Sequence, residues 1–263
     1  MPEPTSYRPG ELCWADLSTP DPAGAERFYT AVFGWEYVHA GAAYDHYTYA
    51  AADRQMVAGI APARDGGTGW VVAFATDSAE AVAERVRQAG GDIAEGPEDF
   101  GVQGRSVLAV DPAGAHVAFW QPRAHLGAGR VGEPSSLCWA ELAVRDVAGA
   151  DRFYAAVLGL RAAEHAAAGS ADYAAYRLDG EPVAGRTVLR AGQQDVEPFW
   201  MPYFGATDAG AAVRTAEREG GSVLFSGATG EGAGLAVLAD PWGATFAVLE
   251  LAAREPDGSA GVG

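Results

Sequence analysis

Two short segments combine an aromatic ring with an acidic group, a pairing that suits acid–base or ligand-binding chemistry. Trp14 and Asp16 lie two positions apart, and Trp139 and Glu141 repeat this spacing 125 residues later. A carboxylate can transfer a proton or pair with a cation, and an indole offers a flat face for stacking. His116 adds an imidazole, the side chain that most often exchanges protons near neutral pH. We therefore take Asp16 and His116 as the candidate catalytic residues.

The candidate residues lie in an internal duplication. The segment LCWADL at 12–17 returns as LCWAEL at 137–142, and residues 21–34 return as 146–159 at the same offset. Such self-similarity indicates two copies of one structural unit. The expected division is a first domain at 1–124, a linker at 125–136, a second domain at 137–253 and a flexible tail at 254–263.

Within each copy the apolar pattern predicts a strand, a helix and further strands, twice over. The first helix is expected between an N-cap at Asp21 and a C-cap at Gly34, with apolar residues every three or four positions. A second helix is expected after an N-cap at Asp77. The predicted fold class is α+β with antiparallel or mixed sheets. The strands predicted in the first copy are 12–18, 35–39, 44–50, 55–61, 70–76, 107–110 and 115–121.

Each copy carries a strand, then D-x6-F-Y-x3-(L/F)-G, then D-P-x-G near its end. This order resembles the vicinal oxygen chelate superfamily, which includes glyoxalase I, extradiol dioxygenases and bleomycin-resistance proteins. The C-W-x-(D/E)-L opening is similar to a tandem-domain actinomycete branch that includes proteins of anthracycline biosynthesis clusters. The resemblance implies two tandem glyoxalase-like domains, each made of two β-α-β-β-β units that form an incomplete barrel around a cavity.

The resemblance also implies where enzymes of this family hold a divalent metal through His and Glu side chains. Rings and aliphatic groups offer no donor suited to such an ion. We therefore expect no metal and no cofactor, and no Lewis-acid catalysis. The residues of this sequence at the implied positions are Trp14, Val71 and Ala118 in the first copy and Trp139, Met201 and Ala247 in the second.

Strand alternation predicts which side chains share the cavity with Trp14. Leu12 and Asp16 should face inward with it, and Cys13 should pack against the helices. The register leaves three alternatives open: Tyr47 or Tyr49, Trp70 or Phe74, and Tyr173 or Tyr176. The candidate ligand-binding residues, all aromatic or acidic, are Trp14, Asp16, Tyr49, Trp70, Phe74, His116, Trp120, Trp139, Glu141, Tyr176, Trp200 and Tyr203.

Composition excludes several functions. The 263 residues include 18 arginines, no lysine and 35 acidic residues, which gives a net charge of −17. A chain this acidic repels a phosphate backbone, which excludes nucleic-acid binding. A P-loop and Schiff-base chemistry both require a lysine, so these are excluded as well. No apolar run reaches the roughly 18–20 residues of a membrane span. With only two cysteines, a cytoplasmic location is the expectation.

Two functions fit this pattern. The first is metal-independent binding or sequestration of an aromatic or polycyclic small molecule, such as a cationic polyketide antibiotic, for self-resistance or relief of product inhibition. The second is a metal-free polyketide-tailoring enzyme of lyase, isomerase or cyclase type, with Asp16 or His116 as acid–base. Alternatively, Trp14 and Trp139 fill a former metal site as packed core, and one cavity or both could be functional. A biosynthetic enzyme could be a partner, and the chain could be a monomer or a homodimer.

Overall fold

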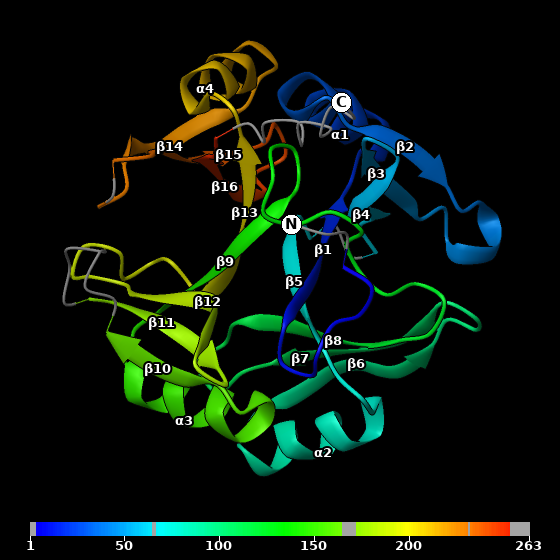
Figure 1. The fold of residues 1–263 in the computed structure, drawn as a ribbon, viewed down its shortest axis with the longest axis vertical. Coiled ribbons are helices and arrows are strands. Elements are labelled where there is room, and N and C mark those ends of the chain that lie inside the picture. The colour runs from blue at the N-terminus through cyan, green and yellow to red at the C-terminus, as the bar shows by residue number, and fades with distance from the viewer. Residues whose placement is uncertain (1–3, 65–66, 165–171, 231, 253–263) are drawn as a thin grey trace, which may run out of the picture.

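The computed structural model describes residues 4–64, 67–164, 172–230 and 232–252, so the tail predicted at 254–263 lies outside the described residues. The described residues form two eight-stranded sheets, one from each copy (Figure 1). The first half contains β1 (Leu12–Thr19), α1 (Pro22–Phe33), β2 (Glu36–His39), the 3-10 turn η1 (Ala42–Tyr44), β3 (Thr48–Ala52), β4 (Gln55–Pro62), β5 (Gly69–Ala75), α2 (Ala79–Gln88), β6 (Asp92–Asp99), β7 (Gly104–Val110) and β8 (His116–Pro122). The second half contains β9 (Leu137–Val144), α3 (Val147–Leu158), β10 (Arg161–Glu164), β11 (Tyr173–Leu178), β12 (Glu181–Val188), β13 (Phe199–Ala206), α4 (Ala209–Arg218), β14 (Ser222–Ala228), β15 (Gly234–Ala239) and β16 (Thr245–Glu250).

Each half consists of two β-α-β-β-β units, which confirms the α+β prediction. The strand order in the first sheet is β2-β3-β4-β1-β5-β8-β7-β6, and the second sheet has the same plan, β10-β11-β12-β9-β13-β16-β15-β14. β1 pairs in parallel with β4 and antiparallel with β5, and β5 pairs in parallel with β8. The first strands of both units therefore lie together at the centre of a mixed sheet.

The helix ends follow local capping chemistry. The Asp21 carboxylate accepts a hydrogen bond from the backbone of Gly24 at 2.9 Å, and Gly34 ends α1 in the left-handed conformation, both as predicted. The prediction for α2 was wrong by one residue, because Ser78 rather than Asp77 supplies the cap. In the part of the chain that the structure describes, no helix has the length and apolarity needed to cross a bilayer.

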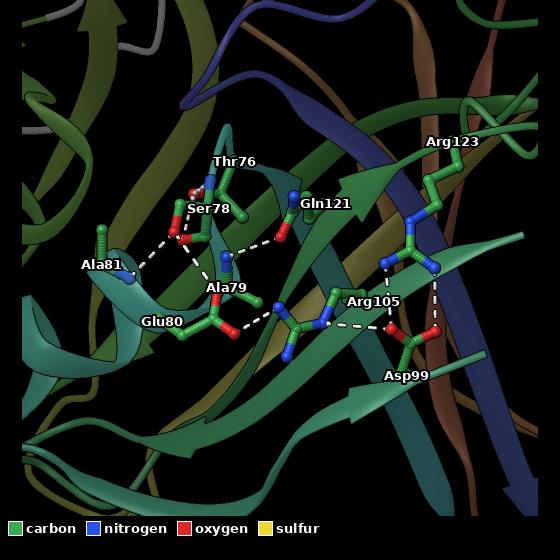
Figure 2. Close-up of polar contacts among 9 residues, drawn as sticks. All are labelled: Thr76, Ser78, Ala79, Glu80, Ala81, Asp99, Arg105, Gln121 and Arg123. Atoms are coloured by element: carbon green, nitrogen blue, oxygen red, sulfur yellow. Dashed lines mark hydrogen bonds and ion pairs between the residues drawn. The ribbon is translucent and has the colours of Figure 1, made fainter. Parts of the chain in front are cut away.

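The sequence analysis missed β6, an edge strand of the first sheet. Six of its eight residues are exposed and half are acidic, so it lacks the apolar alternation of a half-buried strand. Ion pairs hold this region (Figure 2): Arg123 contacts both carboxylate oxygens of Asp99 at 2.8 and 2.9 Å, and Arg105 lies between Asp99 and Glu80 of α2. These contacts join residues far apart in the sequence and leave no periodic pattern.

The two halves pack through the helix-bearing faces of their sheets, here called the outer faces. Helix α1 lies beside α4 and α2 beside α3, while β5 and β13 meet at the centre (Figure 1). Phe74 and Trp200 contact each other there with 5.2 Å between ring centroids, and Trp70 and Phe204 do so at 5.1 Å. The two largest apolar clusters contain residues of both halves. The duplication therefore builds one shared core between the copies.

Four predicted ligand-binding residues are buried on the outer faces, so their predicted place in a cavity was wrong. Trp70, Phe74 and Trp200 lie where the two sheets meet, and Tyr176 donates a hydrogen bond to Asp151 of α3 at 2.9 Å. Large rings are buried wherever two layers pack, on either side of a sheet. Ring type alone therefore does not separate a binding face from a core face.

A tyrosine from each Phe-Tyr motif crosses to the Asp-Pro-x-Gly turn of the other half. The Tyr29 hydroxyl donates to Asp240 at 3.1 Å, and the Tyr154 hydroxyl donates to Asp111 at 2.9 Å. Each aspartate also accepts two backbone N–H bonds within its own turn. The motifs that reveal the duplication therefore also join the two copies.

Tyr154→Phe is expected to lower the free energy of unfolding by about 1–3 kcal/mol. The change removes the hydroxyl donor to the buried Asp111 and the acceptor for the Trp200 indole N–H, which lies 2.7 Å from the hydroxyl. Urea denaturation measures the loss. Tyr44→Phe, at an exposed tyrosine, is the matched control and should stay within about 0.5 kcal/mol of the parent. Equal stability of the two variants would contradict a stabilising role for the Tyr154 hydroxyl.

Candidate functional site

The face of each sheet opposite the helices, here called the inner face, carries the predicted aromatic residues that are not in the shared core. On the first inner face Trp14, Ala73 and Ala118 lie in register on β1, β5 and β8. The apolar cluster of this face comprises Cys13, Trp14, Ala73, Ala75, Ala118 and Ala128, with Tyr7, Tyr49, Met56, Val71, Trp120 and Val131 packed against them.

Curling of the sheet brings distant strands together on this face. The rings of Tyr49 on β3 and Trp120 on β8 both approach His125, with centroids 5.4 and 5.5 Å from it. Three strands separate β3 from β8 in the sheet, so a flat sheet could not make both contacts. This curvature is the incomplete barrel that the resemblance implies.

A β-bulge in β1 changes part of the predicted alternation. The register with β5 shifts between Leu12 and Trp14. Cys13 consequently joins Trp14 in the inner cluster, and Leu12 packs against the outer clusters. The predictions for Leu12 and Cys13 were wrong, because one extra residue in a strand reverses the facing of its neighbours.

Trp14, Asp16 and Tyr47 form the polar centre of the first inner face. One carboxylate oxygen of Asp16, Oδ1, accepts hydrogen bonds from the Tyr47 hydroxyl at 2.5 Å and from the Trp14 indole N–H at 3.0 Å. Tyr49 packs edge-on against Tyr47, with ring centroids 4.9 Å apart. Burial raises the pKa of Asp16, and the two hydrogen bonds oppose that rise. A carboxyl in such surroundings exchanges its proton closer to neutral pH than one in water.

Gly59 makes room for this polar centre. It lies beside Asp16 on the neighbouring strand, and a Cβ at this position would overlap the Tyr47 hydroxyl and the Asp16 carboxylate. Gly59→Ala should therefore displace Tyr47 and lower the free energy of unfolding by about 1–3 kcal/mol, as overpacking does. The comparison in urea denaturation is Gly69→Ala, whose Cβ would enter open space. An unchanged stability of Gly59→Ala would contradict this close packing.

The imidazole on this face comes from His125, which the sequence analysis assigned to the linker. Its ring lies edge-on to Trp14 with centroids 4.6 Å apart, and burial lowers the pKa of His125 to about 4. The imidazole is therefore neutral at pH 7. His116 is exposed at the first residue of β8, so its predicted place in the cavity was wrong. His116 shares a strand face with Trp120 but lies at the solvent-exposed end of the strand.

The linker covers part of the first inner face. The Ala128 backbone N–H donates to the Cys13 carbonyl at 2.8 Å, and the next N–H donates to a carbonyl of β4 at the same distance. The Tyr7 hydroxyl donates to the Ala128 carbonyl at 2.6 Å. Beneath these contacts Trp14 is only 4% exposed. Trp14 is therefore packed as a core residue, the alternative that the sequence left open.

The second inner face repeats this plan with different side chains. The Tyr203 hydroxyl on β13 donates to Glu141 Oε2 at 3.0 Å. Tyr173, rather than Tyr176, lies on this face, where its side chain hydrogen-bonds with the Trp139 indole. Within the described residues, the apolar cluster is made of strand residues alone: Met201, Tyr203 and Ala247, with Cys138, Trp139, Phe199, Leu235, Val237 and Leu249 packed against them.

Glu141 has a carboxyl suited to proton exchange near neutral pH. It is half-buried, and burial raises its pKa to about 7, while the Tyr203 hydrogen bond partly offsets that rise. Trp139, two residues away on the same strand face, is also half-buried. A ring and a carboxyl that titrates near pH 7 therefore share one partly accessible surface.

The side chains on the inner faces do not fit a divalent metal ion. The row formed by Trp14, Ala73 and Ala118 presents an indole and two methyl groups. Such groups supply none of the nitrogen, oxygen or thiolate donors that these ions require. Across the described ranges, no three His, Cys, Asp or Glu side chains gather closely enough to share a metal.

Two surface hollows lie away from both inner faces. One, of about 480 Å³, lies along α1 and is bordered by Glu26, Arg27 and Tyr37. The other, of about 290 Å³, lies where Pro9 meets the end of α3. A guest of the inner faces would therefore contact their half-exposed side chains and would not enter either hollow.

Comparison with known proteins identifies the family. Residues 12–119 match the Glyoxalase/Bleomycin resistance protein/Dioxygenase superfamily model, and residues 139–249 match the model of a glyoxalase-like domain. The chain belongs to this superfamily. The resemblance stated from the duplicated motifs is thereby confirmed, as is the tandem arrangement of two glyoxalase-like domains.

Members of the glyoxalase superfamily resemble this chain over nearly its whole length. Anthracycline biosynthesis protein DnrV of Streptomyces peucetius is 36% identical over 274 residues, which cover 98% of this chain and 99% of that protein. Anthracycline biosynthesis protein DauV of Streptomyces sp. (strain C5) is 36% identical over 269 residues, covering 96% and 97%. The Mn(II)-bound glyoxalase from Novosphingobium aromaticivorans has a TM-score of 0.66 at 16% identity, covering 92% of this chain and 82% of that one. The last similarity shows the fold alone.

Proposed function

We propose that this glyoxalase-superfamily chain binds a planar aromatic small molecule without using a metal ion. One observation carries the proposal: each inner face has an indole ring at a position where the resemblance implies a metal donor, with a carboxyl group two residues along the same strand, and on the second face both are only partly buried. Rings of this kind stabilise a stacked guest by about 0.5–1.5 kcal/mol per pair beyond simple burial. The carboxyl adds a polar contact that can fix the orientation of the guest.

The relatives suggest the class of guest and its role. DnrV and DauV are named as anthracycline biosynthesis proteins, which favours an aromatic polyketide. Sequestering such a compound would protect the producing cell or relieve product inhibition of a partner enzyme. The net charge of −17 favours a cationic guest over an anionic one, at the distances where salt leaves it unscreened. A cytoplasmic location and a choice between monomer and homodimer stay predictions.

Titration with an anthraquinone tests this proposal. Quenching of tryptophan fluorescence should saturate, and chromatography of the mixture should recover the anthraquinone unchanged. Calorimetry on the same mixture gives the number of guests per chain. Quenching that rises linearly without saturation, at every concentration the compound's solubility allows, would contradict specific binding.

A second function is a metal-free tailoring enzyme of lyase, isomerase or cyclase type. The raised pKa values of Asp16 and Glu141 favour it, because each group could move a proton at physiological pH. Conversion of a polyketide that is lost in Asp16→Asn or Glu141→Gln, with binding retained, would support catalysis by that group. Full conversion by both variants would exclude these carboxyls as the acid or base.

A further inference from the structure

The two inner faces differ in how much of their surface a guest can reach. Trp14 and Cys13 are buried on the first face, while Trp139 and Cys138, their counterparts, are only partly buried on the second. The linker bridges two strands of the first face and contributes Ala128 to its cluster. Within the described ranges, strands alone build the cluster of the second face. A guest on the first face would have to displace the linker, and one on the second would not.

The polar groups of the second face leave one oxygen available to a guest. Tyr203 donates its hydroxyl hydrogen to Glu141 Oε2. Among the described residues it is the hydrogen-bond partner of this carboxyl, so Oε1 stays available. The Trp139 N–H hydrogen-bonds Tyr173 and so is not left unpaired beside a stacked ring. The rings of this face therefore present apolar surfaces next to one carboxyl oxygen that no described residue hydrogen-bonds.

The surroundings of Glu141 determine whether its carboxyl donates or accepts a hydrogen bond. Burial and the Tyr203 hydroxyl act on this carboxyl, and no guanidinium of the described residues does, while Tyr173 and Cys138 are neutral groups on the same face. A half-buried carboxyl without a cation keeps its proton to higher pH than one in water. A protonated carboxyl donates a hydrogen bond. Its partner would therefore be an acceptor, such as a ketone oxygen.

We infer that the second inner face binds a planar aromatic ketone, whose rings stack on Trp139 and whose carbonyl oxygen accepts a hydrogen bond from the Glu141 carboxyl. This inference rests on the proposed function and assigns it to one half of the chain and one class of ligand. The first face differs because its indole, Trp14, is only 4% exposed beneath the linker, so its ring offers a guest no stacking surface. Trp139, its counterpart, is only partly buried.

The test compares 9-fluorenone with fluorene, two neutral tricyclic compounds that differ by the carbonyl group. Tryptophan fluorescence titrations of the full chain are run at pH 6 and pH 9. At pH 6 fluorenone should bind about tenfold more tightly than fluorene, the contribution of one hydrogen bond. At pH 9 the Glu141 carboxyl is ionised, so this preference should vanish. The affinity for fluorene should stay the same at both values.

Variants of Glu141 locate the effect. Glu141→Gln keeps an N–H donor, so its preference for fluorenone should persist at pH 9. Glu141→Ala has no donor, and its affinity for fluorenone should fall about tenfold at pH 6 and not change with pH. Glu217→Gln, at an exposed glutamate of α4, is the control and should match the parent. Circular dichroism of each variant confirms that it is folded before titration.

Failure of the inference differs from failure of the proposed function. If neither tricyclic compound binds, aromatic binding itself is contradicted. Two results would support aromatic binding but overturn the assignment to the second face. In the first, both compounds bind equally at pH 6. In the second, Asp16→Asn rather than Glu141→Ala removes the preference for fluorenone. Tighter binding of a cationic acridine at pH 9 than at pH 6, without a fluorenone preference, would show a carboxylate that pairs with cations instead.

Discussion

Trp14→Ala is expected to lower the free energy of unfolding by about 3–5 kcal/mol, whereas Trp139→Ala should lower it by about 1–2 kcal/mol. The two residues occupy equivalent positions of the duplicated segment. Trp14 is 4% exposed, packs against His125 and donates to Asp16, so its removal leaves a cavity and an undersatisfied carboxylate. Trp139 is only partly buried, so solvent or neighbouring side chains can occupy part of the space it leaves.

Urea denaturation of both alanine variants measures this difference. Because Trp14→Ala could leave too little folded protein for an equilibrium curve, Trp14→Phe and Trp139→Phe supply the same comparison on a smaller scale. Phenylalanine keeps most of the ring but removes the indole donor and part of the volume. Equal losses at the two positions would mean that the linker gives Trp14 no additional packing, against the contrast drawn between the faces.

The outward position of several rings could be predicted from alternation. Val71 and Met201 occupy positions where the resemblance implies a metal ligand, so their side chains are expected to face inward. The neighbours of an inward-facing residue on a strand face outward. Trp70 and Trp200 are those neighbours, and the structure buries both in the shared core. Tyr203 has the same parity as Met201 and lies on the inner face. The aromatic type of these residues predicted a binding role for all of them. Their odd or even position along the strand distinguishes those on the inner face from those in the shared core.

Other features leave no local signal in the sequence. The bulge that brings Cys13 inward depends on how β1 pairs with β5, and the arginine pairs around β6 join segments far apart in the chain. His125 lies in a stretch without apolar period, yet the curl of the sheet puts it against Trp14. Tertiary packing decides such contacts, so composition and periodicity predict the fold better than the site.

The duplicated halves share the contacts that join them and differ on their inner faces. Each copy gives a tyrosine to the other and receives one, so both are needed for the shared core. The inner faces are not part of that exchange, and they differ. The first has a covering linker and a neutral imidazole, whereas the second has a partly buried ring and carboxyl. The contacts between the halves therefore come from motifs that both copies share, while the proposed binding depends on what distinguishes the two inner faces.

Glu141→Gln is expected to change how stability depends on pH. Burial raises the pKa of Glu141 from its usual 4.5 to about 7, so the folded chain holds this proton over a range where the unfolded chain releases it. Stability then falls as pH rises between these values, because the unfolded state binds fewer protons. The full shift corresponds to about 1.4 kcal/mol per unit, and partial exposure reduces the expected loss to about 2 kcal/mol.

Urea denaturation at pH 4 and pH 8 isolates this contribution. Glutamine does not titrate, so relative to the parent the Glu141→Gln variant should gain about 2 kcal/mol of unfolding free energy between pH 4 and pH 8. Asp16 and Asp240, whose pKa values burial also raises, are present in both proteins and cancel in the comparison. Glu217→Gln should follow the parent at both values. If Glu141→Gln also follows the parent, folding does not change the pKa of Glu141. The carboxyl would then be ionised at neutral pH and could not donate a hydrogen bond to a ketone there.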